Sequence, residues 1–220
     1  MSDEHRDFAS LAAAADAPVE ELALALAAEL RETDRGGALA RLDRLGEELS
    51  AAAAPGDAEI EARACGELLG GIHDLHGDDD EYDNPRNSML DLVLARRRGL
   101  PIALSVVYVA AARRAGIPLA GVGLPGHFVV GHFGTSPPLL LDPFRRGVRV
   151  EADAPPQLLR PWSAHETALR MLNNLVASYT RRMRVGEAIT AARMRLDLPL
   201  PDEERTRVEH ELRALEARLN

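Results

Sequence analysis

The 220-residue chain contains no lysine, so all 26 of its basic residues are arginines. The absence of lysine excludes Schiff-base catalysis and a phosphate-binding loop that depends on lysine. Acidic residues number 35, and the formal net charge is −9. This charge argues against a nucleic-acid-binding protein, because such a protein needs a basic surface to neutralise phosphates. The sequence therefore predicts no nucleic-acid partner.

Cysteine and long apolar segments are also scarce. Cys65 is the single cysteine, which excludes an intramolecular disulfide and fits a reducing compartment. No apolar run approaches the ~20 residues that a membrane span needs, and the acidic first ten residues lack the pattern of a signal peptide. We therefore expect a cytoplasmic protein with no membrane partner.

Helical patterns fill both ends of the chain. Residues 1–70 form the first predicted region, in which Gly36 and Gly37 are expected to interrupt the pattern before a helix over 38–54. Residues 156–220 form the last region, with helices expected over about 164–183, 186–196 and 202–218. In this last region, four residues match the offsets of a tetratricopeptide helix pair, although a packed helical hairpin also explains them: Leu172, Leu175, Tyr179 and Ala188.

Residues 71–155 carry the predicted core. Ser88 and Asp91 resemble a capping box for a helix over 89–98, and Gly99 is a suitable residue to end that helix. Pro101 suits the first position of a following helix over 101–115.

Beyond this helix the apolar pattern changes to alternation, which predicts strands. LPGHFVVGHF and PPLLLDPF read as an antiparallel hairpin, and residues 148–150 as a third strand. The expected fold class is α+β, mostly helical with a small central antiparallel sheet, and we expect the three regions to form one compact unit.

Two residues of the predicted hairpin suggest a reactive site. His127 and Asp142 lie on adjacent strands and can meet if the register puts both on one face, as a loop centred near Thr135 would do. A helix N-terminus, a strand histidine and a neighbouring aspartate are parts of a thiol-hydrolase site, in which the aspartate orients the histidine and the histidine takes a proton from cysteine.

Five motifs surround and include these residues: Tyr82-Asp83-x-Pro85-x-Asn87-Ser88, Arg97-Arg98-Gly99-Leu100-Pro101-Ile102, Gly116-Ile117-Pro118, Pro125-Gly126-His127-Phe128 and Asp142-Pro143-Phe144. Together they resemble the transglutaminase-like superfamily. The sequence looks most like its invasion-regulator SirB-type branch, in which tetratricopeptide-like helices follow a transglutaminase-like core. The resemblance covers about residues 60–185 and implies a papain-like fold.

The sequence departs from this family at the nucleophile. The resemblance implies a cysteine at the start of the helix that precedes Gly116-Ile117-Pro118, and counting back puts Pro101 at that position. Proline offers no nucleophile, whereas the histidine and aspartate are retained as His127 and Asp142. We therefore predict a non-enzymatic binding or regulatory protein with a degenerate site, an unknown protein or peptide partner, and no cofactor.

Other readings of the site stay open. Ser105 lies one turn further along the same helix face and is either a replacement nucleophile or a buried serine bonded to the carbonyl one turn back. Cys65 is either catalytic or, more simply, a buried structural thiol. The alternative function is an unconventional hydrolase or protease that uses His127 and Asp142 with Ser105, a water or a metal. A third is an adaptor that works through the C-terminal helices.

Three further residues of the family motifs are candidate binding residues: Tyr82, Asn87 and Phe128. His127 itself is either a packing residue bonded to Asp142 or a ligand-facing imidazole. His73-x-x-His76 and its neighbouring acids have metal-ligand types, but the spacing is not that of a strong zinc site, so we expect a solvated acidic loop and no metal.

Overall fold

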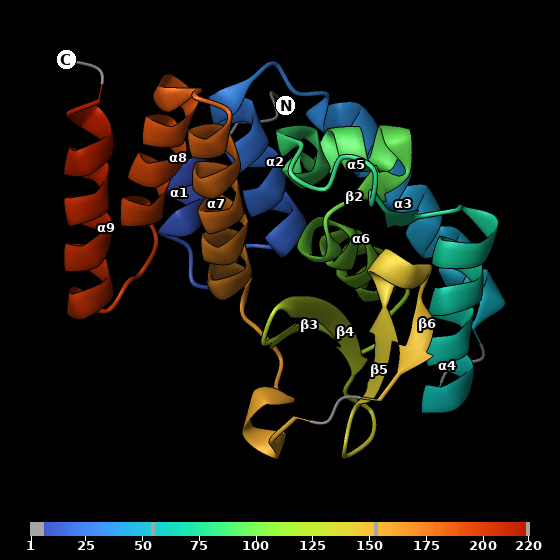
Figure 1. Cartoon of the computed structure of the whole chain (residues 1–220). Coiled ribbons are helices and arrows are strands. Elements are labelled where there is room, and N and C mark those ends of the chain that lie inside the picture. Colours follow the sequence, from blue (N-terminus) through green and yellow to red (C-terminus); the bar gives the residue numbers. More distant parts are fainter. Residues whose placement is uncertain (1–6, 54–55, 152–153, 219–220) are drawn as a thin grey trace. The chain divides into compact units, whose positions relative to one another are not determined.

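The computed structural model describes residues 7–53, 56–151 and 154–218. They divide into two compact units (Figure 1). The sheet unit consists of residues 34–163. The helical unit combines the chain up to Thr33 with the segment from Ala164 onward. Within the described residues no helix is both long enough and apolar enough to cross a membrane.

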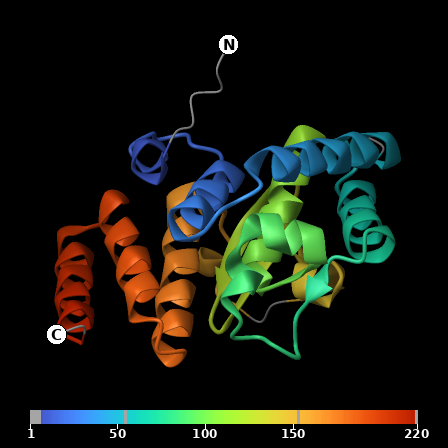
Figure 2. The same cartoon turned by 90° about the horizontal axis from the view of Figure 1, so that it is seen from above.

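The helical unit is built from amphipathic helices. In chain order they are α1 (Phe8–Ala12), α2 (Val19–Leu30), α7 (Ala164–Arg181), α8 (Val185–Asp197) and α9 (Asp202–Glu216). Helices α7, α8 and α9 lie side by side, and α2 packs on α7 and α8 (Figure 2). The four residues with tetratricopeptide-like offsets are all buried, so the predicted helical hairpin is present as α7 and α8.

Helix α6 forms the centre of the sheet unit. It begins at Pro101, whose fixed φ and missing N–H suit a first helical position, and nearly all of its residues are buried. The other helical segments of this unit are α3 (Arg35–Ala52), α4 (Ala58–Cys65), the π-helix η1 (Gly66–Ile72), the 3-10 helix η2 (Pro85–Ser88), α5 (Leu90–Arg96) and the 3-10 segments η3 (Pro143–Arg145) and η4 (Pro156–Leu158).

The sheet is antiparallel and its strands follow chain order. They are β3 (Leu119–Leu124), β4 (His127–His132), β5 (Leu139–Asp142) and β6 (Val148–Val150). Helix α6 packs on β3 and β4, and α4 packs on β5 (Figure 1). A separate parallel pair joins β1 (His76–Gly77) to β2 (Arg98–Gly99). The predicted α+β class, mostly helical with a small antiparallel sheet, is confirmed.

Local predictions failed where glycine or a cap was misread. Helix α3 begins at Arg35, three residues early, because the Asp34 side chain accepts a hydrogen bond from the Gly37 N–H and caps a helix that contains both glycines. Ser88 belongs to η2 and makes no cap for α5. That helix ends at Arg96, because the next residue, Arg97, is left-handed with a φ of 60°, and Gly99 belongs to β2.

The sheet also holds one strand more than predicted, and the unit boundaries differ from the predicted regions. Strand β3 was missed because its sequence, LAGVGL, holds two glycines and lacks clear alternation. The units part at residues 33 and 163 rather than near 70 and 155, because α3 packs on α6 and α4 packs on β5. That the whole chain forms one compact unit stays a prediction.

Candidate functional site

A tight turn positions His127. Pro125 and Gly126 connect β3 to β4, and Leu124 pairs directly with His127 across the hairpin. Gly126 has a φ of 72°, a left-handed conformation that glycine adopts without strain. The Pro-Gly turn therefore places His127 at the first position of its strand.

The strand register brings Asp142 to this histidine. Val130 pairs with Leu141, so continuing the register puts Asp142 opposite Val129, two positions from His127 and on the same face. The His127 Nε2 lies 2.9 Å from Asp142 Oδ2. The other carboxylate oxygen, Oδ1, accepts a hydrogen bond of 3.0 Å from the Phe144 N–H. The contact predicted between His127 and Asp142 is thus present.

This contact defines the chemistry of the imidazole. Because the Asp142 carboxylate accepts from Nε2, the proton of a neutral His127 ring lies on Nε2 and Nδ1 is the basic nitrogen. The Asp142 side chain is 3% exposed, whereas that of His127 is 35% exposed. The aspartate therefore orients a ring that solvent and ligands can reach.

His127 faces a cleft of about 640 Å³. The walls of the cleft come from β1, from the loop after it and from the segment after Asp142, and its lining residues are His76, Gly77, Asp79, His127, Phe144, Arg145 and Arg146. The volume lies in the range of small-molecule and short-peptide sites. Sequence reasoning missed Phe144, Arg145 and His76 as parts of this site; the run Asp-Pro-Phe-Arg-Arg that begins at Asp142 was the available signal for the first two.

Aromatic rings close one side of the cleft. The Phe144 ring lies against Gly77, where a Cβ atom would come within 2.3 Å of the ring. Tyr82, 47% exposed, packs edge-on against Phe144 with ring centroids 5.9 Å apart. Of the three candidate binding residues, Tyr82 is the one beside the cleft.

Asn87 and Phe128 are held inside the protein. Asn87 is fully buried; its amide donates to the Glu81 carbonyl, and its Oδ1 accepts from Arg96. Phe128 is 2% exposed and packs edge-on against Trp162, at 5.3 Å between centroids. These contacts show that Asn87 and Phe128 stabilise the protein interior. A direct contact of either residue with a ligand stays a prediction.

Arg96 joins Asn87 to a buried carboxylate. Its Nη2 lies 2.8 Å from Asp78 Oδ2. Burial by itself would raise the pKa of Asp78, but hydrogen bonds from the Glu81 N–H, Arg96 and Asn87 outweigh it and hold that pKa below its usual value. The network fixes the loop that carries Asp79 and Tyr82 to the cleft.

The two candidate replacement nucleophiles are differently engaged. Ser105 is 1% exposed, and its hydroxyl donates a 2.8 Å hydrogen bond to the Pro101 carbonyl, one turn back. Cys65 is completely buried at the end of α4. Burial, together with the nearby Glu61 carboxylate, raises the pKa of its thiol to about 12. Neither side chain lines the His127 cleft.

The two histidines of the His73-x-x-His76 motif point to different partners. His73 Nε2 lies 2.6 Å from Glu48 Oε2, whereas His76 Nδ1 donates to the Asp74 carbonyl at 2.7 Å. Across the described ranges there is no group of three or more His, Cys, Asp or Glu side chains arranged to hold a metal ion.

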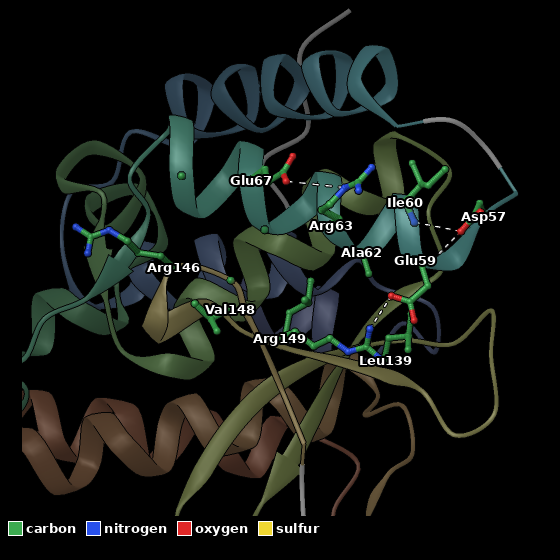
Figure 3. Close-up of a pocket in the computed structure, with 14 residues that line it drawn as sticks. Asp57, Glu59, Ile60, Ala62, Arg63, Glu67, Leu139, Arg146, Val148 and Arg149 are labelled. Atoms are coloured by element: carbon green, nitrogen blue, oxygen red, sulfur yellow. Dashed lines mark hydrogen bonds and ion pairs between the residues drawn. The ribbon is translucent and has the colours of Figure 1, made fainter.

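A second cavity, of about 540 Å³, lies between α4, η1 and the β5–β6 edge of the sheet (Figure 3). Ile60, Leu139 and Leu141 contribute apolar surface to it. Its charged side chains are largely paired across or along its walls, as in the contacts of Arg149 with Glu59 and of Arg63 with Glu67 (Figure 3).

A family model matches most of the sheet unit and part of the helical unit. A family model described as "Transglutaminase-like superfamily" matches residues 37–183. A UPF0162 protein from Xylella fastidiosa is 38% identical over 135 residues, which cover 53% of this chain and 48% of that protein. The chain thus spans about half the length of this relative.

Two further relatives match shorter stretches of the chain, one a UPF0162 protein and the other an F-box protein. A UPF0162 protein from Pseudomonas aeruginosa is 49% identical over 53 residues, which are 24% of this chain and 20% of that protein. F-box only protein 21 from Mus musculus is 42% identical over 50 residues, 23% of this chain and 8% of that protein. No solved structure matches the chain. Because the family model covers more than half of the sequence, and its match includes the His127–Asp142 pair, this chain belongs to the transglutaminase-like superfamily.

Proposed function

We propose that this protein binds a peptide or protein partner at a transglutaminase-like site that has lost its thiol, and that it acts by binding rather than by acyl transfer. The observation that carries this proposal is the pairing of a retained His127–Asp142 hydrogen bond with Pro101 at the first position of α6. His127 is oriented to accept a proton. The cysteine thiol that the family resemblance leads us to expect as the proton donor is replaced by Pro101, which has no ionisable side chain.

The remaining nucleophile candidates support the same conclusion. Ser105 is buried and donates its proton to a backbone carbonyl rather than to His127. With a pKa of about 12, the thiol of Cys65 is almost entirely protonated at neutral pH and is a poor nucleophile. A thiol mechanism would need another cysteine, and the sequence has none.

The cleft suits an extended peptide segment. In the neutral ring, the basic Nδ1 of His127 is a hydrogen-bond acceptor for a backbone or side-chain N–H, because Asp142 holds the proton on Nε2. Phe144 and Tyr82 provide aromatic surface, and Arg145, whose side chain is 76% exposed, provides N–H donors for carbonyl or carboxylate groups. The ligand class is thus a peptide with polar backbone contacts at His127 and an apolar side chain against Phe144.

The finer family assignment belongs to the same proposal. We infer membership of the SirB-type branch from the motifs around Asn87, Pro101 and His127, and a tetratricopeptide-like character for α7 and α8 from the burial of Leu172 and Tyr179 at the expected offsets. In this view the C-terminal helices provide a second surface for the partner.

A water-activating hydrolase is the second candidate, and one observation favours it. A histidine oriented by a carboxylate and 35% exposed in a cleft has the geometry of a general base. This mechanism needs neither Ser105 nor Cys65. Incubation of the wild type with mixed peptide and ester substrates separates the two candidates: we expect no turnover, and turnover that disappears in His127→Ala would favour the hydrolase.

Restoring the thiol tests the proposed origin of the site. In Pro101→Cys, made in a Cys65→Ala background, the new thiol lies at a helix N-terminus, where free amides and the helix dipole favour thiolate. His127 should favour it further by accepting the proton. We expect alkylation by iodoacetamide at pH 7 to be about threefold to tenfold faster than for free cysteine.

The matched control is Val185→Cys in the same background, which puts a thiol at the first position of α8. Adding His127→Ala to the Pro101→Cys variant should lower its rate to that of the control. If the two thiols react equally and His127→Ala changes neither, the site does not have the arrangement of a thiol hydrolase and the proposal is lost.

A further inference from the structure

A smaller pocket, of about 230 Å³, lies in the sheet unit between α3, the end of α5 and the segment that follows η1. Its lining includes three arginines, Arg41, Arg44 and Arg97, together with His73 and Glu48. Three buried leucines complete it: Leu45, Leu75 and Leu94. The pocket shares no lining residue with the cleft of His127.

The pocket concentrates positive charge in an acidic protein. Three guanidinium groups face one carboxylate, which gives a formal charge of 3 − 1 = +2 with His73 neutral, whereas the whole chain carries −9. Arg41 and Arg44 are three residues apart on α3 and so share one helix face. Arg97 is the left-handed residue that directly follows α5, and it lines the pocket from that side.

The three arginines differ in their hydrogen-bond and ion-pair partners. Arg41 donates through Nη1 to the Leu94 carbonyl at 2.7 Å, and His73 engages the single carboxylate, Glu48, at 2.6 Å. Among the residues that the structure describes, Arg44 and Arg97 have no hydrogen-bond or ion-pair partner for their guanidinium groups. The Arg97 charge acts on Asp74 only from a longer range, and Asp74 is itself paired with Arg146.

We propose that this pocket binds a small oxyanion of the phosphate class, either free phosphate or a phosphate monoester. Each guanidinium presents its N–H donors in a planar fork that matches two oxygens of such an anion. A phosphate monoester carries about −1.5 to −2 charges at neutral pH, which complements the formal charge of the pocket. The volume suits a phosphate group with a short substituent, and the leucines offer contact to that substituent.

The arrangement assigns distinct roles to the arginines. Arg44 and Arg97 contact the anion from opposite elements, α3 and the end of α5, with bidentate hydrogen bonds. Arg41, already fixed by the Leu94 carbonyl, directs its remaining N–H groups with little further loss of side-chain freedom. Because the pocket and the His127 cleft share no lining residue, this inference does not depend on the proposed function.

The test is a titration of the full chain with inorganic phosphate and with glycerol phosphate, at constant ionic strength set by chloride. We expect a saturable rise in melting temperature for the wild type, since a ligand that binds only the folded state stabilises it. Calorimetry on the same samples gives the dissociation constants. A tighter constant for glycerol phosphate would assign the site to monoesters, and an equal or weaker one would assign it to free phosphate.

The variants are Arg44→Gln and Arg97→Asn, because asparagine tolerates the left-handed conformation at position 97. Each should weaken phosphate binding about tenfold, and the double variant should abolish the saturable response. Arg207→Gln is the matched control, because Arg207 is an exposed arginine of α9 outside the pocket; it should bind like the wild type. Melting temperatures without phosphate establish that each variant folds. The proposal is overturned if chloride alone reproduces the wild-type response or if the double variant keeps it.

Discussion

The sequence Gly-His-Phe occurs twice along β4 and its flanks, at residues 126–128 and 131–133, and the two copies do different things. Both histidines bond a carboxylate, His127 to Asp142 at 2.9 Å and His132 to Glu61 at 2.7 Å. The side chain of His127 is 35% exposed and lines a cleft, whereas that of His132 is 1% exposed.

The buried pair is complete within the protein. His132 Nδ1 accepts a hydrogen bond from the Gly134 N–H, so that Nε2 carries the proton donated to Glu61. The other Glu61 oxygen accepts from the Gly56 N–H. Every polar atom of the His132 ring thus has a partner, and no part of it is available to a ligand.

The two histidines differ in their access to solvent and not in residue type, so access distinguishes a ligand-facing pair from a structural one. Successive strand residues point to opposite faces, so two histidines five positions apart cannot both face the cleft. The Pro125–Gly126 turn places the first at the start of the strand beside the cleft, and the second lies at the far end against α4. The motif alone does not separate them, but the proline before the first glycine does.

The largest expected consequence of this difference is in stability. Glu61→Ala leaves the buried His132 N–H and the Gly56 N–H without their acceptor, and we expect the free energy of unfolding to fall by about 3 kcal/mol. His127→Ala removes a partly exposed ring, and we expect a loss of about 1 kcal/mol or less. Urea denaturation of both variants measures the contrast.

His132→Ala is the companion to these variants, because it removes the other half of the buried pair. It should destabilise the protein by more than His127→Ala does. Equal losses for the two histidine variants would show that the His127 pair is as much a structural element as the buried one, and that its exposed ring face is incidental.

Much of the fold could be predicted because its signals are local. Pro101 and Gly116 bracket α6, and the Gly-Thr-Ser segment between the two apolar runs fixes the hairpin that brings Asp142 to His127. Strand β3 and the π-helix η1 could not be predicted in this way. Gly70, for example, is required because a Cβ atom there would come within 1.9 Å of the Arg146 carbonyl oxygen, a contact between segments far apart in sequence.

The candidate site was predictable only in part for the same reason. His127 and Asp142 follow from one hairpin, whereas His76 reaches the cleft through β1, which pairs with β2. Asn87 and Phe128 belong to sequence motifs that serve packing, so their burial was not distinguishable from a binding role. The phosphate-class pocket joins α3 to Arg97, 53 residues after Arg44 in the sequence, and a sequence rich in arginine gives no sign of it.

Chemical modification gives a smaller but more direct contrast between the two histidines. Diethyl pyrocarbonate acylates accessible neutral imidazoles, so His127 should react in the folded protein. His132 should react only when local unfolding exposes its ring. We expect His127 to react at least about tenfold faster. Both lie in one tryptic peptide, residues 115–145, so fragmentation in the mass spectrometer assigns the label.

Unfolding in urea provides the control for this experiment, because it should make the two rates equal. The Glu61→Ala variant should raise the rate at His132 by loosening its surroundings. Comparable labelling of the two histidines in the folded wild type would contradict the burial of His132. It would also show that the two rings do not differ in solvent access.

The smallest expected effect concerns the turn that makes the first copy different. Gly126 has a φ of 72° and no atom within 4 Å of the position that a Cβ would occupy, so substitution there acts through backbone strain alone. Gly126→Ala should lower the free energy of unfolding by about 1 kcal/mol, because alanine disfavours the left-handed region. Gly126→Asn should cost less, because asparagine enters that region more readily. Thermal unfolding of the two variants measures the difference. If alanine proves as stable as glycine, the turn does not hold His127 in place by its left-handed residue, and the cleft position of the ring must come from Asp142 and the strand register.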